Sequence, residues 1–203
     1  MKKLLLISFL VIAGTITSQA QGKLVGGPCE GCEAVFEYGD QNLSSVDTLP
    51  EFGSEGVDIK VTGTVYEPDG KTPAEGVILY VYQTNEEGVY PKKGGETGWA
   101  KRHGYIRGWI KKDSDGRYTF YTQRPMFYGT APAHIHVTIL EPNGKYYYIQ
   151  DFLFEGDKNL TSRQLNNRNP RGGNNGIISY KKEEGILTGK RDIILGMNVP
   201  YYM

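Results

Sequence analysis

Two of the three histidines in the chain, His134 and His136, are separated by a single residue within a run that is typical of a β-strand. Side chains two residues apart on a strand point to the same face, so both imidazoles can bind one ion. This spacing predicts a metal site. The same spacing also arises by chance in ordinary strands, and spacing alone leaves both interpretations open.

The tyrosines that precede this pair indicate which metal would bind. A tyrosinate is a hard, anionic oxygen donor that suits ferric iron better than the zinc or copper usually expected at a two-histidine site. Ferric iron is therefore the predicted ion, and the alternative is that these tyrosines are ordinary packing residues. The tyrosines concerned are Tyr80, Tyr82, Tyr90, Tyr118, Tyr121 and Tyr128.

Several short motifs follow one another in one order along the chain. They are G-V-Y at 88–90, I-R-G-W at 106–109, D-S-D-G-R-Y-T-F at 113–120, R-P-M-F-Y at 124–128, P-A-H-I-H at 132–136 and Q-D-F-L-F-E-G-D at 150–157. This series resembles the intradiol ring-cleavage dioxygenases, non-heme ferric enzymes that cleave catechols between the two hydroxyls. The likeness is greatest to the protocatechuate type, and it covers about residues 61–157.

The resemblance implies that Tyr90, Tyr128, His134 and His136 hold one non-heme Fe(III) ion. It also implies that Tyr128 leaves the iron and takes up a substrate proton when a catechol binds, a role for which a metal-lowered phenol pKa is suited. The implied reactants are O2 and a small aromatic diol, a catechol or hydroxyquinol, and the product is a muconate-type diacid. A catalytically degenerate metal-binding relative is the alternative within the same family.

Three further residues are candidates for contact with the substrate or with oxygen. Gln150 matches an active-site glutamine of the protocatechuate type, where its amide would donate to an oxygen intermediate. Arg107 and Arg124 are the cations nearest to the site in sequence. They either attract an anionic catechol or form ordinary surface ion pairs.

The chain departs from the family pattern in two places. Ala131 stands where familiar members carry an arginine that is expected to face the substrate. The segment between Tyr128 and His134 is also shorter than in those members. The missing arginine predicts weaker stabilisation of the negative charge that develops on the substrate, with consequences for the rate and reaction class, and the shorter segment predicts a more open iron site.

The N-terminus has the pattern of a secretory signal peptide. A basic start precedes an apolar run at 4–13 that is too short to span a bilayer, and Ser18-Gln19-Ala20 offers a cleavage site. This pattern predicts that residues 1–20 are removed and that the mature chain is exported to the periplasm or the extracellular space. The only cysteines, Cys29 and Cys32, then lie in an exported chain, where a local disulfide is expected rather than a redox or zinc site.

Alternating polar and apolar residues between glycine and proline turns predict an all-β fold. One β-sandwich domain is expected at 57–203, after an extended N-terminal arm at 21–56. A polar loop is expected at 157–176, with its arginines, Arg163, Arg168 and Arg171, solvated at the surface. Strands are expected at 57–65, 77–83, 118–122, 135–140, 146–154, 176–180 and 191–195.

Two other interpretations fit parts of the sequence. A cupin barrel also uses H-x-H followed by glutamate, and Glu141 follows His136 by five residues, but E-P-N-G at 141–144 is typical of a turn. A secreted sandwich module that binds carbohydrate or protein would use the tyrosines for packing or stacking. The joint presence of Tyr90, Tyr128 and the histidine pair favours the iron site over both.

Charge indicates which partners are not expected. Without Lys2 and Lys3, which the signal peptide carries, 21 basic residues are balanced against 23 acidic ones. This balance favours neither nucleic acid nor a membrane surface as a partner. The sequence does not determine the oligomeric state.

Overall fold

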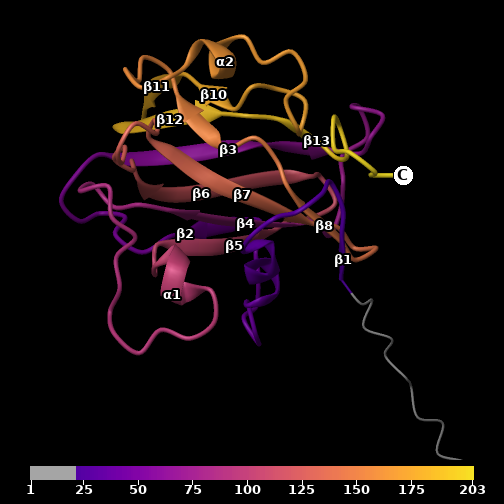
Figure 1. The fold of residues 1–203 in the computed structure, drawn as a ribbon, viewed down its shortest axis with the longest axis horizontal. Coiled ribbons are helices and arrows are strands. Elements are labelled where there is room, and N and C mark those ends of the chain that lie inside the picture. The colour runs from indigo at the N-terminus through magenta and orange to yellow at the C-terminus, as the bar shows by residue number, and fades with distance from the viewer. Residues whose placement is uncertain (1–21) are drawn as a thin grey trace, which may run out of the picture.

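The computed structural model describes residues 22–203, so the predicted signal peptide at 1–20 lies outside the described residues. Two mixed β-sheets pack together, and the short helices α1 and α2 lie at opposite sides of them (Figure 1). The all-β sandwich prediction is therefore confirmed. Within the described range, no helix has both the length and the apolar character that a membrane crossing requires.

The first sheet carries the two neighbouring histidines. Its main path runs in the order β1-β8-β7-β4-β5, and β9 and β10 extend it from β7. Its strands are β1 (Lys23–Leu24), β4 (Ile78–Gln83), β5 (Arg107–Lys111), β7 (His134–Leu140), β8 (Lys145–Tyr148), β9 (Phe152–Phe154) and β10 (Ile177–Ile178).

The second sheet covers one face of the first. Its path runs in the order β11-β12-β3-β6-β2, and β13 also pairs with β3. Its strands are β2 (Val46–Thr48), β3 (Asp58–Tyr66), β6 (Arg117–Gln123), β11 (Tyr180–Glu183), β12 (Ile186–Lys190) and β13 (Ile193–Ile194). The helices are the 3-10 helix η1 (Cys32–Phe36), α1 (Ala100–His103) and α2 (Ser162–Leu165).

Alternation along β7 gives the first sheet two buried faces. Ile135 and Ile139 belong to the main core, together with Phe120 of the second sheet. Leu140 belongs to a second buried cluster on the opposite face, together with Tyr80 of β4 and residues of η1. We call this opposite face, which the N-terminal residues cover, the outer face of the first sheet.

The segment expected as an extended arm thus contributes to both sheets. β1 pairs with β8, β2 pairs with β6, and η1 packs against the outer face between them in sequence. Cys29 and Cys32 are joined by a disulfide at the start of η1. Burial of Cys32 and of the η1 residues Ala34 and Val35 holds this segment against the sheet.

The predicted strand at 146–154 is two strands, because a bulge interrupts it. Thr138 pairs with Tyr148, and Ile135 pairs with Phe152. Residues 149–151 therefore face only two residues of β7, so this stretch holds one extra residue. A bulge of this kind breaks the ladder and redirects side chains. The predicted loop at 157–176 also differs, since it contains α2, whose first turn is capped by Thr161.

The C-terminal residues that support this bulge approach β3 at Gly63. A Cβ on Gly63 would lie 1.8 Å from the backbone oxygen of Arg191. That oxygen accepts a hydrogen bond from the Tyr118 hydroxyl at 2.6 Å. Arg191 in turn donates from Nη1 to the backbone oxygen of Gln150 at 2.6 Å. The missing side chain at Gly63 thus allows the contact that holds the bulge from behind.

We predict that Gly63→Ala destabilises the protein by about 1–3 kcal/mol, because the added methyl overlaps backbone rather than a side chain that can move. Urea unfolding measures the effect. Lys60→Ala, on the half-exposed face of the same strand, is the control, with a change within about 0.5 kcal/mol. Equal unfolding midpoints for the two variants would show that the backbone at Arg191 is not constrained.

Candidate metal centre

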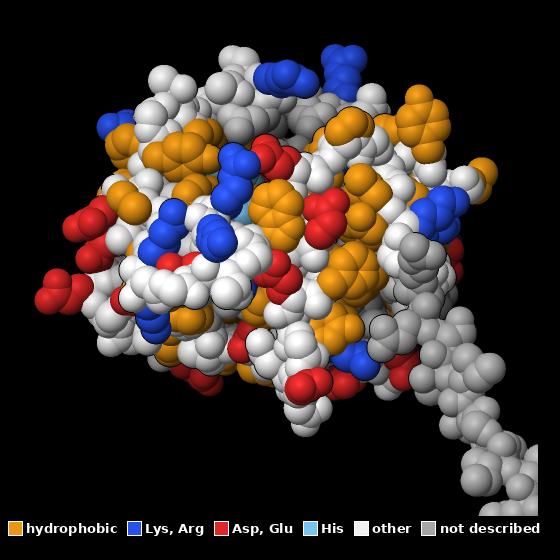
Figure 2. Space-filling view, turned by 60° about the horizontal axis from the view of Figure 1, so that its bottom comes forward, with side chains coloured by type: hydrophobic (Ala, Val, Ile, Leu, Met, Phe, Trp, Pro, Cys, Tyr) orange, Lys and Arg blue, Asp and Glu red, His pale blue; other side chains and the backbone are white. Residues whose placement is uncertain are grey.

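Strand alternation places both neighbouring histidines on the outer face of the first sheet. Ile135, between them, points into the main core and is fully buried. In the ladder His136 is paired with Tyr82 of β4, and His134 is paired with Leu153 of β9. Only a small area of histidine is visible on this side of the molecule, among hydrophobic and charged side chains (Figure 2).

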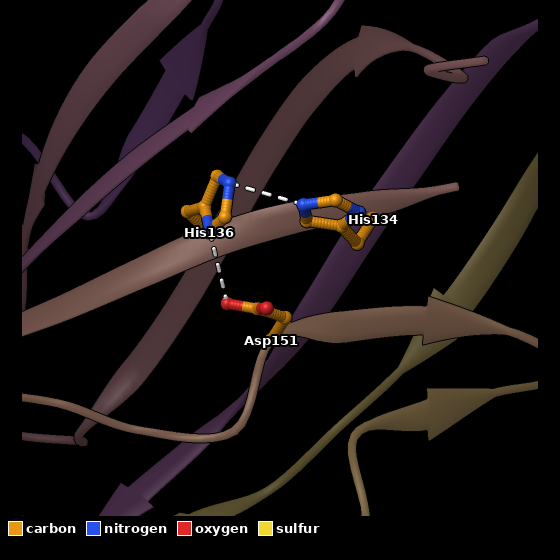
Figure 3. Close-up of side chains that lie close together, drawn as sticks. All are labelled: His134, His136 and Asp151. Carbon is orange, nitrogen blue, oxygen red and sulfur yellow. Dashed lines mark hydrogen bonds and ion pairs between the residues drawn. The ribbon is translucent and has the colours of Figure 1, made fainter. Parts of the chain in front are cut away.

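The hydrogen-bond partners of the two imidazoles indicate which nitrogen carries each proton. His134 Nδ1 lies 2.7 Å from the backbone oxygen of Pro132, which can only accept, so this nitrogen donates. His136 Nδ1 lies 3.3 Å from a carboxylate oxygen of Asp151 and donates as well (Figure 3). In the neutral form of each ring the lone pair therefore lies on Nε2, and the two Nε2 atoms face each other at 3.0 Å.

This pair of nitrogens has the geometry of two ligands of one ion. Nitrogens that each lie about 2.1 Å from an ion, at right angles to one another, are about 3 Å apart. Facing lone pairs at that separation repel each other, and a cation between them removes the repulsion. His134, His136 and Asp151 also form a group of potential metal ligands, whose donor atoms lie within 4.8 Å of one another.

The two predicted tyrosine ligands lie at the same place. The Tyr90 hydroxyl lies 2.9 Å from His136 Nε2. The ring of Tyr128 lies 5.9 Å from that of Tyr90 and 5.5 Å from that of His134, measured between centroids. The structure thus brings together all four residues that the family resemblance implies as iron ligands.

The turn at 85–89 carries Tyr90 to this position and is tied to the segment before Tyr128. Asn85 accepts at its backbone oxygen from the amide of Met126, at 3.0 Å. Gly88 has a positive φ, and a Cβ there would lie 2.5 Å from the backbone oxygen of Phe127. Only glycine permits this approach without strain. Glycine in the G-V-Y motif therefore serves to bring the two tyrosines together.

Burial has opposite effects on the two kinds of donor. It raises the pKa of Tyr90 well above its ordinary value, and the neighbouring Tyr128 adds to the rise. It lowers the pKa of His134, with a further contribution from His136. His134 is therefore a neutral donor at pH 7. The Tyr90 phenol keeps its proton until a cation stabilises the phenolate.

Asp151 is the functional residue that the sequence analysis missed. Because of the bulge, Gln150 and Asp151 together oppose His136, and successive side chains point to opposite sides. Asp151 contacts His136, whereas the Gln150 amide oxygen accepts from Asn167 at 3.2 Å. A carboxylate on the outer nitrogen of a ligand histidine orients the ring and raises its basicity. The sequence did contain a signal for this residue, since Asp151 directly follows the predicted Gln150.

The third histidine belongs to the same aromatic stack. Tyr82 lies between His103 and His136, with ring centroids 3.7 Å and 4.4 Å away and interplanar angles of 7° and 22°. His103 Nδ1 also lies 2.8 Å from the hydroxyl of Tyr80. Burial, aided by the nearby His136, lowers the pKa of His103 to about 4. Tyr82, with a neutral His103 stacked behind it, thus packs against the face of the His136 ring. Asp151 contacts the Nδ1 edge of the same ring.

The two arginines expected near the substrate have other partners. Arg107 donates to Glu37 at 2.7 Å and lies over the ring of Trp109. Arg124 lies 3.9 Å from Asp157 and over the ring of Phe154. Neither guanidinium is directed at the histidine pair by these contacts.

Glu141, the residue on which the cupin interpretation depends, is also placed elsewhere. Its carboxylate accepts from the hydroxyls of Tyr147 and Tyr202, at 2.7 and 2.9 Å. These contacts direct the side chain toward the C-terminus rather than the histidines. The glutamate of a cupin-like ligand set is therefore lacking at this centre.

Comparisons with known proteins point to one family. No family model matches the chain. Over 104 residues, 51% of the chain, it is 31% identical to catechol 1,2-dioxygenase 1 of Acinetobacter lwoffii, and it spans about a third (32%) of that relative's length.

Solved structures share the fold at low identity. The dioxygenase domain of a dioxygenase carbohydrate-binding protein fusion from Streptomyces sp. SirexAA-E has a TM-score of 0.53 at 22% identity, covering 76% of this chain and 90% of that one. An intradiol ring-cleavage dioxygenase from Tetranychus urticae has a TM-score of 0.54 at 18% identity, covering 76% and 87%. The predicted resemblance is therefore confirmed in fold, and in sequence over about half of the chain.

We predict that Asp151→Asn lowers the affinity for ferric iron about 10–100-fold, because the amide orients His136 without adding negative charge. His134→Ala and Tyr90→Phe should abolish iron retention, and Gln150→Ala, whose side chain contacts Asn167, should preserve it. Iron content after dialysis against a graded chelator measures all four. A loss with Asp151→Asn as complete as with His134→Ala would instead make Asp151 a direct ligand.

We also predict that His103 makes the folded protein less stable at acid pH. The folded pKa of His103, about 4, lies below the ordinary value of 6.5, so the unfolded chain binds this proton more readily. The stabilisation is complete above pH 6.5 and is lost as the pH falls from 6.5 toward 4. His103→Phe keeps an aromatic ring in the stack without a titrating group. The melting temperature of the metal-free variant should therefore fall less between pH 7 and 4.5 than that of the wild type; equal falls would contradict this account.

Proposed function

We propose that this chain, a relative of the intradiol ring-cleavage dioxygenases in fold and sequence, is a non-heme ferric dioxygenase. Its substrate would be a catechol-type diol, cleaved between the two hydroxyls with O2 to give a muconate-type diacid. The observation that carries the proposal is the convergence of three donor atoms. The Nε2 atoms of His134 and His136 lie 3.0 Å apart, and the Tyr90 hydroxyl lies 2.9 Å from His136 Nε2.

The donor set supports ferric iron over other metals. Two imidazoles and two phenols converge, and phenolates are hard anionic donors that suit Fe(III). Zinc sites with histidine ligands do not need tyrosines, so Tyr90 and Tyr128 would have no role there. A sandwich module that binds sugars would not need the facing lone pairs of His134 and His136.

Each ligand would have a distinct role. Ferric iron at this site would supply the Lewis acidity that draws electron density from a bound catecholate and opens its ring to O2. Tyr128 is 40% exposed, the more accessible of the two phenols, and would leave when the diol binds. Its phenolic oxygen would take the proton from a substrate hydroxyl. Tyr90, half-buried beside His136, would stay in place.

The residues behind the ligands would hold this geometry. Asp151 would keep the proton on His136 Nδ1, so that Nε2 always faces the ion. The backbone oxygen of Pro132 would do the same for His134. Of the two residues opposite His136, we therefore propose Asp151 rather than Gln150 as the one that supports the ligand.

We also propose that the protein acts outside the cytoplasm. The signal-like pattern at 1–20 supports export. The disulfide between Cys29 and Cys32 supports an oxidising compartment, since such bonds persist there.

The proposal predicts a visible absorption band from tyrosinate to iron in the protein loaded with ferric iron. Anaerobic addition of catechol should shift the band, because catecholate would replace Tyr128. When O2 is then admitted, the protein with bound catechol should consume it. Tyr90→Phe should abolish the band. Tyr121→Phe, which changes a phenol on β6 of the other sheet, is the matched control and should leave it unchanged.

The possible results separate the alternatives. A colourless protein that retains no ferric iron would refute the proposal and favour the binding module. A band that shifts with catechol, without any uptake of oxygen, would identify a metal-binding relative that has lost the reaction.

A further inference from the structure

A buried arginine lies behind the metal centre, on the core side of the bulge. Arg191 is 3% exposed, and its guanidinium carbon lies 4.8 Å from the centre of the Phe152 ring. Its Nη1 donates to the backbone oxygen of Gln150 at 2.6 Å, whereas Nε and Nη2 are buried without a hydrogen-bond partner among the described residues. Burial lowers the pKa of Arg191 to about 10, against opposing effects of Tyr118 and Asp151, so the side chain is charged at pH 7.

Packing alone does not account for an arginine at this position. A charged group that leaves water loses its hydration, and buried N–H groups without partners add to the cost. An apolar side chain of similar volume would fill the same part of the core without that cost. The contact that distinguishes Arg191 from such a side chain is its hydrogen bond to Gln150, so the bulge is the place where it acts.

The two contacts of Arg191 lie on either side of Asp151 in the chain. Gln150, whose backbone oxygen accepts from Nη1, precedes Asp151, and Phe152, whose ring lies against the guanidinium, follows it. The ion pairs among the described residues do not include Arg191, so it acts on Asp151 through these two neighbours. Fixing both from the core side directs Asp151 to the outer face, where its carboxylate lies 3.3 Å from His136 Nδ1.

The backbone of Arg191 is itself held by the second sheet. Its amide donates to the backbone oxygen of Thr62 on β3 at 2.9 Å, and its backbone oxygen accepts from the Tyr118 hydroxyl on β6 at 2.6 Å. A continuous series of contacts therefore runs from the second sheet through Arg191 and the bulge to Asp151 and His136.

Resting on the proposed function, we infer that Arg191 is a positioning residue of the metal centre. It holds the bulge so that Asp151 keeps the proton on His136 Nδ1 and leaves Nε2 free for the ion. A carboxylate behind a ligand histidine contributes to metal affinity only when it is itself held in the right place. The inference thus assigns a role at the iron to a side chain that contacts none of the four ligands directly.

Nitrogen NMR of the imidazoles in the metal-free protein, at about pH 8 where histidine is ordinarily neutral, tests the inference without iron. In the wild type, His136 should carry its proton on Nδ1. Arg191→Met keeps an unbranched chain beside the Phe152 ring but removes the hydrogen bond to Gln150, so it should give a mixture of the two His136 tautomers. Arg191→Lys keeps a charge but not the planar guanidinium, so its effect should be in the same direction and smaller.

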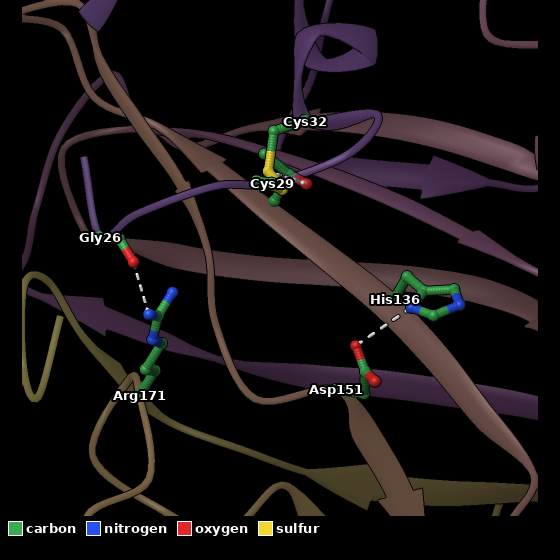
Figure 4. The surroundings of a disulfide bond; sticks show 7 residues. Gly26, Cys29, Cys32, His136, Asp151 and Arg171 are labelled. Atoms are coloured by element: carbon green, nitrogen blue, oxygen red, sulfur yellow. Dashed lines mark hydrogen bonds and ion pairs between the residues drawn. A yellow bond between two sulfur atoms is a disulfide. The ribbon is translucent and has the colours of Figure 1, made fainter. Parts of the chain in front are cut away.

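Arg171→Met is the matched control. Arg171 also lies over an aromatic ring, that of Tyr148, and also donates to a backbone oxygen at 2.6 Å. That oxygen belongs to Gly26, and the Arg171 side chain points toward it, whereas Asp151 points toward His136 (Figure 4). The His136 tautomer should therefore stay as in the wild type.

Iron affinity separates positioning from a merely structural role. Arg191→Met should weaken retention of ferric iron about tenfold or more, within the range expected for a partner behind a metal ligand. In a protein that already carries Asp151→Ala, the same change should have little further effect, because the carboxylate through which it acts is gone. If Arg191→Met does not fold, Arg191→Lys in the two backgrounds carries the same comparison.

The possible results separate this inference from the proposed function. An unchanged His136 tautomer in both Arg191 variants, a shift as large in Arg171→Met, or an equal loss of iron with and without Asp151→Ala would overturn the inference and leave the dioxygenase in place. A tautomer shift confined to the Arg191 variants, in a protein that retains no ferric iron, would refute the proposed function alone.

Discussion

The pairing of β7 with β4, on a sheet covered on both faces, is the constraint on which the rest of the structure depends. Because alternate residues of β7 pack into the main core, His134 and His136 must share the outer face. The ladder then sets Tyr82 beside His136, which allows the stack with His103. Loss of this register would turn both imidazoles into the core, since a slip of one residue reverses every side chain.

Covering the outer face has a consequence for chemistry as well as for stability. The N-terminal residues that bury Tyr80 and Leu140 also cover part of the outer face next to His136. Part of the space that remains is a cavity bounded by the disulfide segment at 28–32. The same segment that completes the packing therefore also forms part of the surroundings of His136.

Most of the strands could be predicted from the sequence, since β3 alternates polar and apolar residues and β4 and β7 are short runs rich in apolar and β-branched residues. Short elements such as β5, β11 and β12 were missed, because their pairing with neighbours, rather than their own pattern, makes them strands. The disulfide of Cys29 and Cys32 was expected as a local fastening. Its position beside His136 was not, because no local pattern reports which distant strand a segment will cover.

Sequence alone determined the donor types and the shared face of the two histidines, because side-chain alternation on a strand is a local property. The order of motifs pointed to Tyr90 and Tyr128 through family resemblance. Only the tertiary structure decided that Asp151, and not Gln150, contacts His136. The reason is the extra residue at 149–151. A bulge exists only relative to the partner strand, so its effect on side-chain direction follows from pairing between distant segments and cannot be found in either segment alone.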